Sequence, residues 1–242
     1  MDMYKTLREE AWEANMEIPR RKLAIYTWGN VSAFDPALGV FAIKPSGVPY
    51  DALTPESMVV VDLDGAVAAG KLNPSSDTET HRVLYREFVR LAGGAPVPVK
   101  GITHTHSPYA VAFAQARRPV PVYGTTHADH GAGEIPCTEY MDEESVKNDY
   151  ELETGNLIAE TFRKQGVNPF DIQMVLVAGH GPFTWGKDAA QSVYHAAVLE
   201  EVCKMAHITL TLNPEQKPLP DYIIRKHWER KHGDGAYYGQ KN

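Results

Sequence analysis

The sequence predicts a mixed α/β fold, on three observations. Short runs rich in β-branched and aromatic residues alternate along the chain with longer segments whose apolar residues recur at helical spacing. Of the 242 residues, 43% are apolar, which is the composition of an ordinary folded core. The chain contains no repeats or low-complexity segments, so we expect one domain that spans residues 1–242.

The first third of the chain predicts a helix followed by strands. The N-terminal helix carries apolar residues on one side, and we expect it to stop at Ile18-Pro19. Asp35-Pro36 and Gly39 separate the next two β-rich runs, which predicts a hairpin, although Trp28-Gly29-Asn30 interrupts the first run. The expected elements are a helix over residues 3–16 and strands over 23–33, 40–43, 58–63 and just after the Asp64-Gly65 turn.

The middle third predicts two helices on either side of a strand that carries histidines. Leu84, Phe88 and Leu91 recur at helical spacing after a polar loop, and Gly93-Gly94 ends that helix. Ser107-Pro108 is typical of an N-cap and first helical residue, so the next helix begins directly after the histidines. Further short strands are expected over residues 120–123 and 134–137.

The last third predicts a buried strand between two helices. Residues 154–165 form the first helix, which Gly166 ends. The strand, residues 174–178, is continuously apolar, so we expect it at the centre of the sheet and buried on both faces. Asp188 and Gln191 resemble a capping box that opens the longest helix, and a short amphipathic stretch follows it in the tail.

Charge and cysteine content exclude several classes of function. The formal net charge is −7 and the pI is near 5.8, which disfavours a nucleic-acid partner because binding of a phosphate backbone needs a basic face. Cys137 and Cys203 lie far apart and form no CxxC motif, which fits a reducing compartment, the cytoplasm. The N-terminus lacks the apolar core of a signal peptide, and no apolar run approaches the roughly 18 residues of a membrane span.

Two histidines in the stretch 101–107 form the strongest candidate for a metal site. Side chains alternate between the faces of a strand, so His104 and His106 project together while Thr105 projects away. His180 follows another run of strand character, before Gly181-Pro182. Three protein nitrogens with an open fourth position are typical of a catalytic zinc site, whereas the pair alone is also typical of hydrogen-bonded strand histidines.

The other histidines have simpler interpretations. Asp129 lies between His127 and His130 in a run dense in Gly, Thr, His and Asp, which is either part of a site or an ordinary polar turn. Four more are typical of packing or surface residues in helices or in the basic tail: His81, His195, His207 and His232.

Three polar loops are candidates for a phosphate site. Their small residues let backbone N–H groups and hydroxyls approach an anion, and Lys44 adds positive charge. Each loop taken singly is typical of a turn or an N-cap, so the coincidence of the three carries the prediction. The loops contain the pairs Gly29-Asn30, Ser46-Gly47 and Ser75-Ser76.

Two tyrosines between glycines, Tyr237 and Tyr238, predict a C-terminus that docks into the core or onto a neighbouring subunit. A phenol, with its ordinary pKa of about 10, can also act as a general acid or base beside a metal-bound substrate.

Taken together, these motifs resemble one known family. In chain order they are T-W-G-N-V-S at 27–32, I-K-P-S-G at 43–47, P-S-S-D-T at 74–78, H-T-H-S at 104–107, G-T-T-H-A-D at 124–129, H-G-P-F at 180–183 and A-Y-Y-G-Q at 236–240. The chain is similar over essentially its whole length to the L-ribulose-5-phosphate 4-epimerase family of the class II aldolase/adducin superfamily.

The resemblance implies a three-layer α/β/α fold with a largely antiparallel central sheet. It also implies a homotetramer of four-fold symmetry with active sites between adjacent subunits, in which the tail, about residues 214–242, contributes to a neighbour's site. Asp77 stands where the related sugar-phosphate aldolases carry a glutamate, which favours the epimerase. The implied ligands of Zn²⁺, or of another divalent ion such as Mn²⁺ or Co²⁺, are Asp77, His104, His106 and His180.

The resemblance also assigns roles around a phosphorylated ketopentose. Asp129 and Tyr238 of a neighbouring subunit would be the two acid–base groups, and His227 would lie near the substrate for binding, orientation or proton transfer. The implied phosphate contacts are Gly29, Asn30, Ser46, Gly47, Ser75 and Ser76, and the charge of Lys44 is a candidate addition from the sequence itself.

The implied activity is interconversion of L-ribulose 5-phosphate and D-xylulose 5-phosphate through cleavage and re-formation of the C3–C4 bond. The alternatives are a sugar-phosphate aldolase of the L-fuculose-phosphate type and a metal-free, adducin-like interaction domain, against which the three histidines count. The reaction belongs to carbohydrate metabolism, arabinose catabolism among its settings, and arabinose, ascorbate and other sugars stay open as the source.

The sequence departs from the family pattern in three places. The connector Gly93–Lys100 is longer and richer in proline, and Thr103 replaces an apolar strand residue. His130 stands where an aromatic residue is common, so the pKa of the neighbouring Asp129 is expected to differ.

Overall fold

The computed structural model describes residues 3–232 and 236–237, and its centre is a seven-stranded sheet. The strand order is β4-β3-β2-β1-β5-β7-β6, and every neighbouring pair is antiparallel. The strands are β1 (Asn30–Asp35), β2 (Val40–Ile43), β3 (Val59–Asp62), β4 (Val67–Ala69), β5 (Gly101–His104), β6 (Met174–Leu176) and β7 (Pro182–Gly186).

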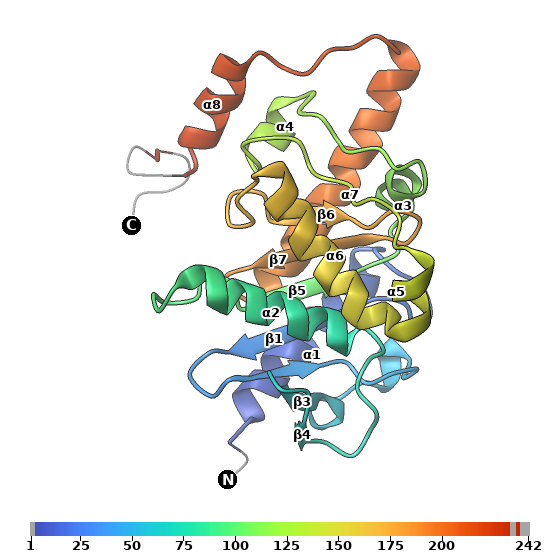
Figure 1. Cartoon of the computed structure of the whole chain (residues 1–242), viewed down its shortest axis with the longest axis vertical. Coiled ribbons are helices and arrows are strands. Elements are labelled where there is room, and N and C mark those ends of the chain that lie inside the picture. The colour runs from blue at the N-terminus through green and yellow to red at the C-terminus, as the bar shows by residue number, and fades with distance from the viewer. Residues whose placement is uncertain (1–2, 233–235, 238–242) are drawn as a thin grey trace.

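Helices cover both faces of this sheet, as Figure 1 shows. α2 (Thr78–Ala92) and α6 (Tyr150–Gln165) lie in front of it, and their apolar sides meet aromatic residues of the strands such as Phe34 and Trp185. α1 (Lys5–Arg20) and α7 (Ala189–Leu212) lie behind it and share a second core with β1 and β2. The three-layer α/β/α architecture with an antiparallel sheet is therefore confirmed.

Shorter elements complete the fold. α3 (Pro108–Gln115) packs against α7 and β6, and α8 (Asp221–Glu229) packs against α4 (Thr125–Ala128). The remaining short elements are α5 (Glu143–Asn148) and the 3-10 turns η1 (Tyr50–Ala52) and η2 (Pro55–Ser57). Within the described ranges, no helix is both long enough and apolar enough to cross a membrane.

Two glycines let the start of α7 lie directly against the sheet. A Cβ on Gly101 would stand 2.3 Å from the Asp188 carbonyl oxygen, and one on Gly186 would stand 2.9 Å from Gln191 Cβ. The Asp188 carboxylate accepts a hydrogen bond from the Gln191 amide at 2.7 Å and so caps α7, as the sequence predicts. This close contact fixes β5 and β7, the strands that flank the candidate site, against the longest helix.

Several expected elements begin or end at other residues in the structure, and two expected strands are not formed. Residues 23–29 are not a strand, because Lys22 and Tyr26 adopt positive φ values of 58° and 54°, and β1 begins only at Asn30. α1 continues through Pro19 to Arg20, since a proline this close to the helix end removes only one hydrogen bond. Leu91 of α2, which continues the helical spacing of Leu84 and Phe88, is 40% exposed, whereas those two residues are buried. The segments 120–123 and 134–137 are not strands, because Val120 and Ile135 form only an isolated bridge.

The apolar strand predicted at the centre of the sheet is instead at its edge. β6 has β7 on one side only, so the central placement was wrong, although all three of its residues are buried. The reason is that residues 136–138 cover its open side: the Leu176 amide donates to the Pro136 carbonyl and the Thr138 amide donates to the Leu176 carbonyl, both at 2.9 Å. Burial on both faces therefore does not distinguish a central strand from a covered edge.

Candidate active site

The candidate site lies at one end of the sheet, where antiparallel pairing places the start of one strand beside the end of the next. Asn30 at the start of β1 pairs with His104 at the end of β5, and His104 pairs with Phe183 at the start of β7. Lys44 directly follows the end of β2, the other neighbour of β1. Segments distant in sequence therefore meet at this end.

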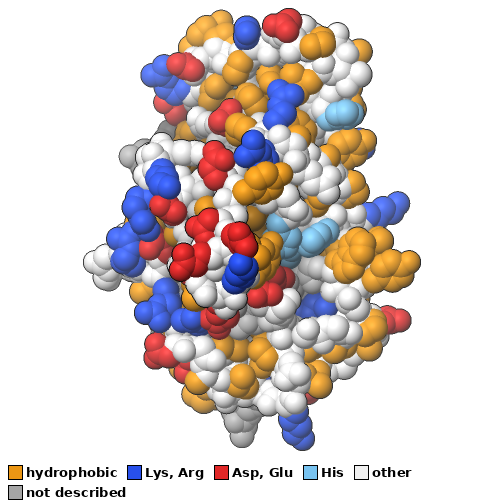
Figure 2. All heavy atoms as spheres, turned by 45° about the vertical axis from the view of Figure 1, so that its right-hand side comes forward, with side chains coloured by type: hydrophobic (Ala, Val, Ile, Leu, Met, Phe, Trp, Pro, Cys, Tyr) orange, Lys and Arg blue, Asp and Glu red, His pale blue; other side chains and the backbone are white. Residues whose placement is uncertain are grey.

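Three histidines form a compact group there. The rings of His104, His106 and His180 have centroid separations of 4.9, 4.7 and 5.2 Å, and one ligand nitrogen from each lies within 4.8 Å of the other two. β5 ends at His104, so His106 lies just beyond the strand, and His180 lies in the turn between β6 and β7. Figure 2 shows histidine side chains gathered at mid-height on one face of the molecule.

The orientation of His104 is fixed by two contacts. Its Nδ1 donates to the Pro182 carbonyl oxygen at 2.9 Å, and its ring stacks on Phe183 at a centroid distance of 4.3 Å. Since the carbonyl can only accept, the proton lies on Nδ1 and the lone pair of Nε2 is free to bind a metal ion.

The protonation state of the group also suits a metal. Burial lowers the pKa of His104 to about 3, with a further contribution from His106, and burial lowers the pKa of His180 to about 4. Burial also lowers the pKa of His106, against an opposing effect of Asp77. Neutral imidazoles are the form that binds metals, and three of them are the donor set of catalytic zinc sites. The residues present therefore fit a divalent ion.

Asp77 lies near the three histidines but outside the group whose ligand atoms are within 4.8 Å. Its carboxylate accepts a hydrogen bond of 2.6 Å from the Asn30 side-chain amide, at the N-cap position of α2. The negative charge of Asp77 acts on His106, His180 and Lys44. The geometry gives Asp77 a contact with Asn30, and a role as ligand stays a prediction.

The predicted phosphate loops meet beside this group. The Ser46 amide donates to the Asn73 carbonyl and the Ser75 amide donates to the Lys44 carbonyl, both at 3.0 Å, so the second and third loops run side by side. Asn30 joins the first loop to the third, since its Nδ2 donates to Ser75 Oγ at 3.2 Å. The structure therefore brings all three loops together; Ser76 lies in the third, and Gly47 lies in the second with no atom within 4 Å of an added Cβ.

Lys44 is buried beneath these loops. Its ammonium donates to the Thr27 carbonyl at 3.1 Å and lies 5.1 Å from the centroid of the Tyr50 ring. Burial lowers the pKa of Lys44, and the charge of Asp77 opposes that shift. Gly29 has a φ of +75°, and a Cβ there would stand 2.8 Å from the His104 carbonyl oxygen, so only glycine allows this approach of the first loop to β5.

Asp129, the predicted acid–base residue, belongs to a second cluster between α4 and α8. Its carboxylate accepts from His227 Nδ1 at 3.0 Å and from Arg230 Nε at 2.8 Å, and Lys231 Nζ lies 3.6 Å away. Burial raises the pKa of Asp129, but these hydrogen bonds and the charge of Lys231 outweigh burial and hold the pKa below its ordinary value. The carboxylate is therefore ionised at neutral pH.

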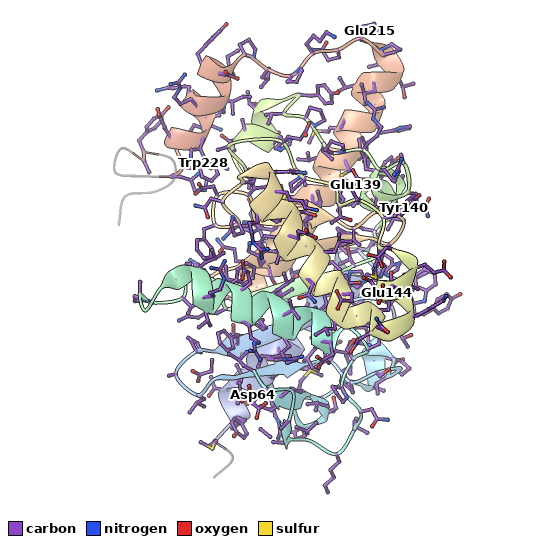
Figure 3. The ribbon with its side chains drawn as sticks, viewed as in Figure 1. Asp64, Glu139, Tyr140, Glu144, Glu215 and Trp228 are labelled. Carbon is purple, nitrogen blue, oxygen red and sulfur yellow. The ribbon has the colours of Figure 1, made fainter. Side chains whose placement is uncertain are left out.

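This second cluster forms within one chain. α8 lies back over α4, and Figure 3 marks Trp228 on α8 and Glu215 in the connection that leads to it from α7. Among the described residues, the partners of Asp129 come from α8 and the residues just after it, and the three histidines are not among them. Tyr238 lies outside the described residues.

The structure adds residues that the sequence argument missed. Arg230 and Lys231 surround Asp129, and the basic run near the C-terminus is the signal that points to them. The Tyr150 ring lies 5.9 Å from His180 and the Trp28 ring 6.1 Å from His106. No sequence pattern marks these two aromatic residues as neighbours of the histidines.

Comparison with known protein families shows to which family the chain belongs. Residues 9–207 match the family model described as "Class II Aldolase and Adducin N-terminal domain". The chain belongs to the class II aldolase and adducin family.

Within this family, named relatives are similar to nearly the whole chain. Proteins named L-ribulose-5-phosphate 4-epimerase UlaF from Salmonella paratyphi B and from Salmonella typhi are each 48% identical over 235 residues, covering 97% of this chain and 99% of theirs.

Solved structures share the fold at lower identity. An L-fuculose 1-phosphate aldolase has a TM-score of 0.75 at 22% identity, covering 93% of this chain and 95% of its own. An aldolase II superfamily protein from Pseudomonas syringae has a TM-score of 0.73 at 16% identity, covering 95% of this chain and 85% of its own.

Proposed function

We propose that the protein is an L-ribulose-5-phosphate 4-epimerase that interconverts L-ribulose 5-phosphate and D-xylulose 5-phosphate. The observation that carries the proposal is the group of three histidines next to the phosphate loops: Asn30 pairs with His104 in the sheet, and its side chain donates to Ser75. The 48% identity to proteins named for this reaction supports the same substrate.

The chemistry of the substrate explains why a metal and a phosphate site are needed together. C4 of a ketopentose phosphate carries no acidic hydrogen, so epimerisation requires breaking and re-forming the C3–C4 bond. A divalent ion on His104, His106 and His180, zinc in our proposal, would supply positive charge beside the C2 and C3 oxygens as negative charge develops there. Asp77 is proposed as a further ligand.

The chain's own residues hold the two fragments in place. Lys44 and the backbone and hydroxyl groups of the three loops bind the phosphate, which stays on the two-carbon aldehyde after cleavage. With its phosphate anchored, the aldehyde turns its other face towards the three-carbon fragment, and the bond re-forms with inverted C4.

Two acid–base groups are proposed, one for each face of the aldehyde. In cleavage the C4 hydroxyl loses its proton to a base, and in re-addition the new C4 oxygen takes a proton from an acid on the opposite side. We assign these roles to Asp129 and Tyr238, with His227 orienting Asp129 through its hydrogen bond. The hydrogen bonds to Asp129 keep its carboxylate in the ionised form that can accept a proton, although the lowered pKa also makes it a weaker base.

We further propose a cytoplasmic homotetramer of single-domain subunits. α8 packs on Asp129 of its own chain. We therefore propose that α4 and the tail, residues 214–242, together complete the site formed by the histidines of a neighbouring subunit. Cys137 and Cys203 are both free thiols, which favours a reducing compartment.

Product analysis tests the reaction. Purified protein with added zinc should convert L-ribulose 5-phosphate into D-xylulose 5-phosphate, and chelation should stop the conversion. Absence of D-xylulose 5-phosphate, with release of dihydroxyacetone phosphate from a ketose 1-phosphate, would instead identify an aldolase. A chain that binds no divalent ion and turns over neither sugar would be an interaction domain.

Mixed assemblies test the shared site. His106→Asn and Asp129→Asn subunits should each be inactive alone, but random mixing should restore about a quarter of wild-type activity if each site takes its histidines and its aspartate from different subunits. No recovery in verified mixed tetramers would place both groups in one subunit.

A further inference from the structure

Beneath the candidate site, α2 runs along β1 with matched spacing. Four helical residues rise about 6 Å and two strand residues about 6.6 Å, so successive turns of the helix meet alternate residues of the strand. The contacts, in order, are Asn30 Nδ2 to Asp77 Oδ2 at 2.6 Å, Ser32 Oγ to His81 Nδ1 and to Tyr85 Oη at 2.7 Å each, and Phe34 stacked on Tyr85 at 4.6 Å.

Two polar atoms on adjacent steps of this series are buried without a partner among the described residues. They are Asn30 Oδ1 and His81 Nε2. Asn30 is 2% exposed and His81 is fully buried. A buried polar atom without a hydrogen bond destabilises the folded protein, so each of these atoms needs a partner.

The contacts show which atoms still lack a partner. The Asn30 amide donates through Nδ2 to Asp77 Oδ2 and to Ser75 Oγ, which leaves Oδ1 as an acceptor. His81 Nδ1 and Tyr85 Oη each lie 2.7 Å from Ser32 Oγ, and Tyr85 Oη also donates to the Ser32 carbonyl oxygen at 3.2 Å. The contact with Ser32 therefore occupies Nδ1 and leaves Nε2 as the ring nitrogen that needs a partner.

We propose that one buried water molecule joins His81 Nε2 to Asn30 Oδ1, and that His81 is thereby a positioning residue for the Asn30 amide. One water can donate to Asn30 Oδ1 and either accept from or donate to His81 Nε2, depending on which ring nitrogen carries the proton. The amide matters because its Nδ2 holds Ser75 and Asp77. The functional consequence rests on the proposed phosphate site; the hydrogen-bonded link itself does not.

Two substitutions at His81 test the roles of its two ring nitrogens separately. The amide of Gln reaches the position of Nε2, whereas the amide of Asn reaches only the position of Nδ1. His81→Asn should raise KM for L-ribulose 5-phosphate about tenfold, and His81→Gln should keep KM within about threefold of wild type. Calorimetry with inorganic phosphate on the zinc-loaded protein should give the same ratio of dissociation constants.

A matched control removes a buried hydrogen bond on the other face of the sheet. Thr184 Oγ1 donates to the Ser192 carbonyl oxygen at 2.8 Å, and both residues are fully buried. Thr184→Val should lower Tm as His81→Asn does but leave KM and phosphate affinity unchanged. If Thr184→Val raises KM as much as His81→Asn does, the rise reflects general destabilisation of the fold. That result would overturn the proposal.

Other results would also support or contradict the proposed link between His81 and Asn30. Equal loss of phosphate affinity in His81→Asn and His81→Gln, or no loss in either, would contradict the role of Nε2. If both variants fail to fold, a high-resolution crystal structure of the wild type tests the link directly. We expect a water molecule within about 3 Å of both His81 Nε2 and Asn30 Oδ1. An apolar neighbour at Nε2 in place of the water would overturn the link. Phosphate affinity that responds as expected in a protein without epimerase activity would support the link and reject the proposed function.

Discussion

Gly181 is the residue at which the smallest change should disturb the histidine group most. It follows His180 and lies against the backbone between His104 and His106. A Cβ at this position would stand 2.8 Å from the Thr105 carbonyl oxygen and 3.3 Å from His104 Cε1. Gly181→Ala therefore places a methyl group directly after His180, against the Thr105 backbone and the His104 ring.

The size of the effect follows from these distances. Ordinary contact begins at 3.4 Å, so the Thr105 carbonyl and the substituted residue must separate by about 0.6 Å, and neither is a flexible side-chain end. Overpacking of this kind costs about 1–3 kcal/mol, or roughly 3–10 °C in Tm for a chain of this size. Displacing ligands through their supporting backbone typically costs 10–100-fold in metal affinity or activity.

The assay combines zinc affinity, measured by competition with a chelator, with thermal unfolding and the rate of D-xylulose 5-phosphate formation. Gly181→Ala should weaken zinc binding and turnover by about 10–100-fold each. Gly133→Ala is the matched control, because the Cβ there would meet only Ile172 Cδ1 at 3.8 Å and should change neither quantity. Wild-type zinc affinity in Gly181→Ala, with Gly133→Ala also unchanged, would refute the idea that the β6–β7 turn determines the ligand geometry.

Three further substitutions test separate parts of the site. His106→Asn should remove bound zinc and activity together, and an active, metal-free variant would exclude the proposed role of the ion. Lys44→Met should raise KM for the sugar phosphate about tenfold without lowering Tm, because the ammonium is buried at an energetic cost; an unchanged KM would place the phosphate elsewhere. Asp129→Asn should unfold more easily than wild type at pH 7. The folded pKa of Asp129 lies below its unfolded value of about 3.9, so its stabilising effect is complete above that value and is lost as pH falls through the folded pKa. The Tm difference between the two proteins should therefore shrink below about pH 4, and a constant difference would show that the ion pairs do not stabilise the fold.

The elements predicted well from the sequence are those in which a local signal agrees with burial. Gly93 and Gly166 end α2 and α6 with φ values of 57° and 64°, as expected of C-terminal glycines. The position of β6 in the sheet could not be predicted. Its apolar run indicates that the strand is buried, but not which segments of the chain cover it. β7 was missed because it begins at Pro182, directly after a turn.

For the site, the sequence correctly placed His104 at the end of a strand and Ser75-Ser76 before a helix, and the antiparallel pairing explains why Asn30 and His104 meet. The buried contact of His81 with Ser32 could not be predicted, because it depends on the register of α2 against β1. The pairing of Asp129 with Arg230 of its own chain required the path of the tail, which crosses from α7 to α8 without a regular element.

The covered edge at β6 has a consequence for how copies of this chain can associate. An open edge strand is a template for pairing with a strand of another molecule, but residues 136–138 already occupy the hydrogen-bonding groups of Leu176. At the other edge, β4 has three residues and an irregular register against β3. Neither edge favours growth of the sheet from one molecule into the next, so the proposed tetramer would have to form through helix faces and loops and not through strand pairing.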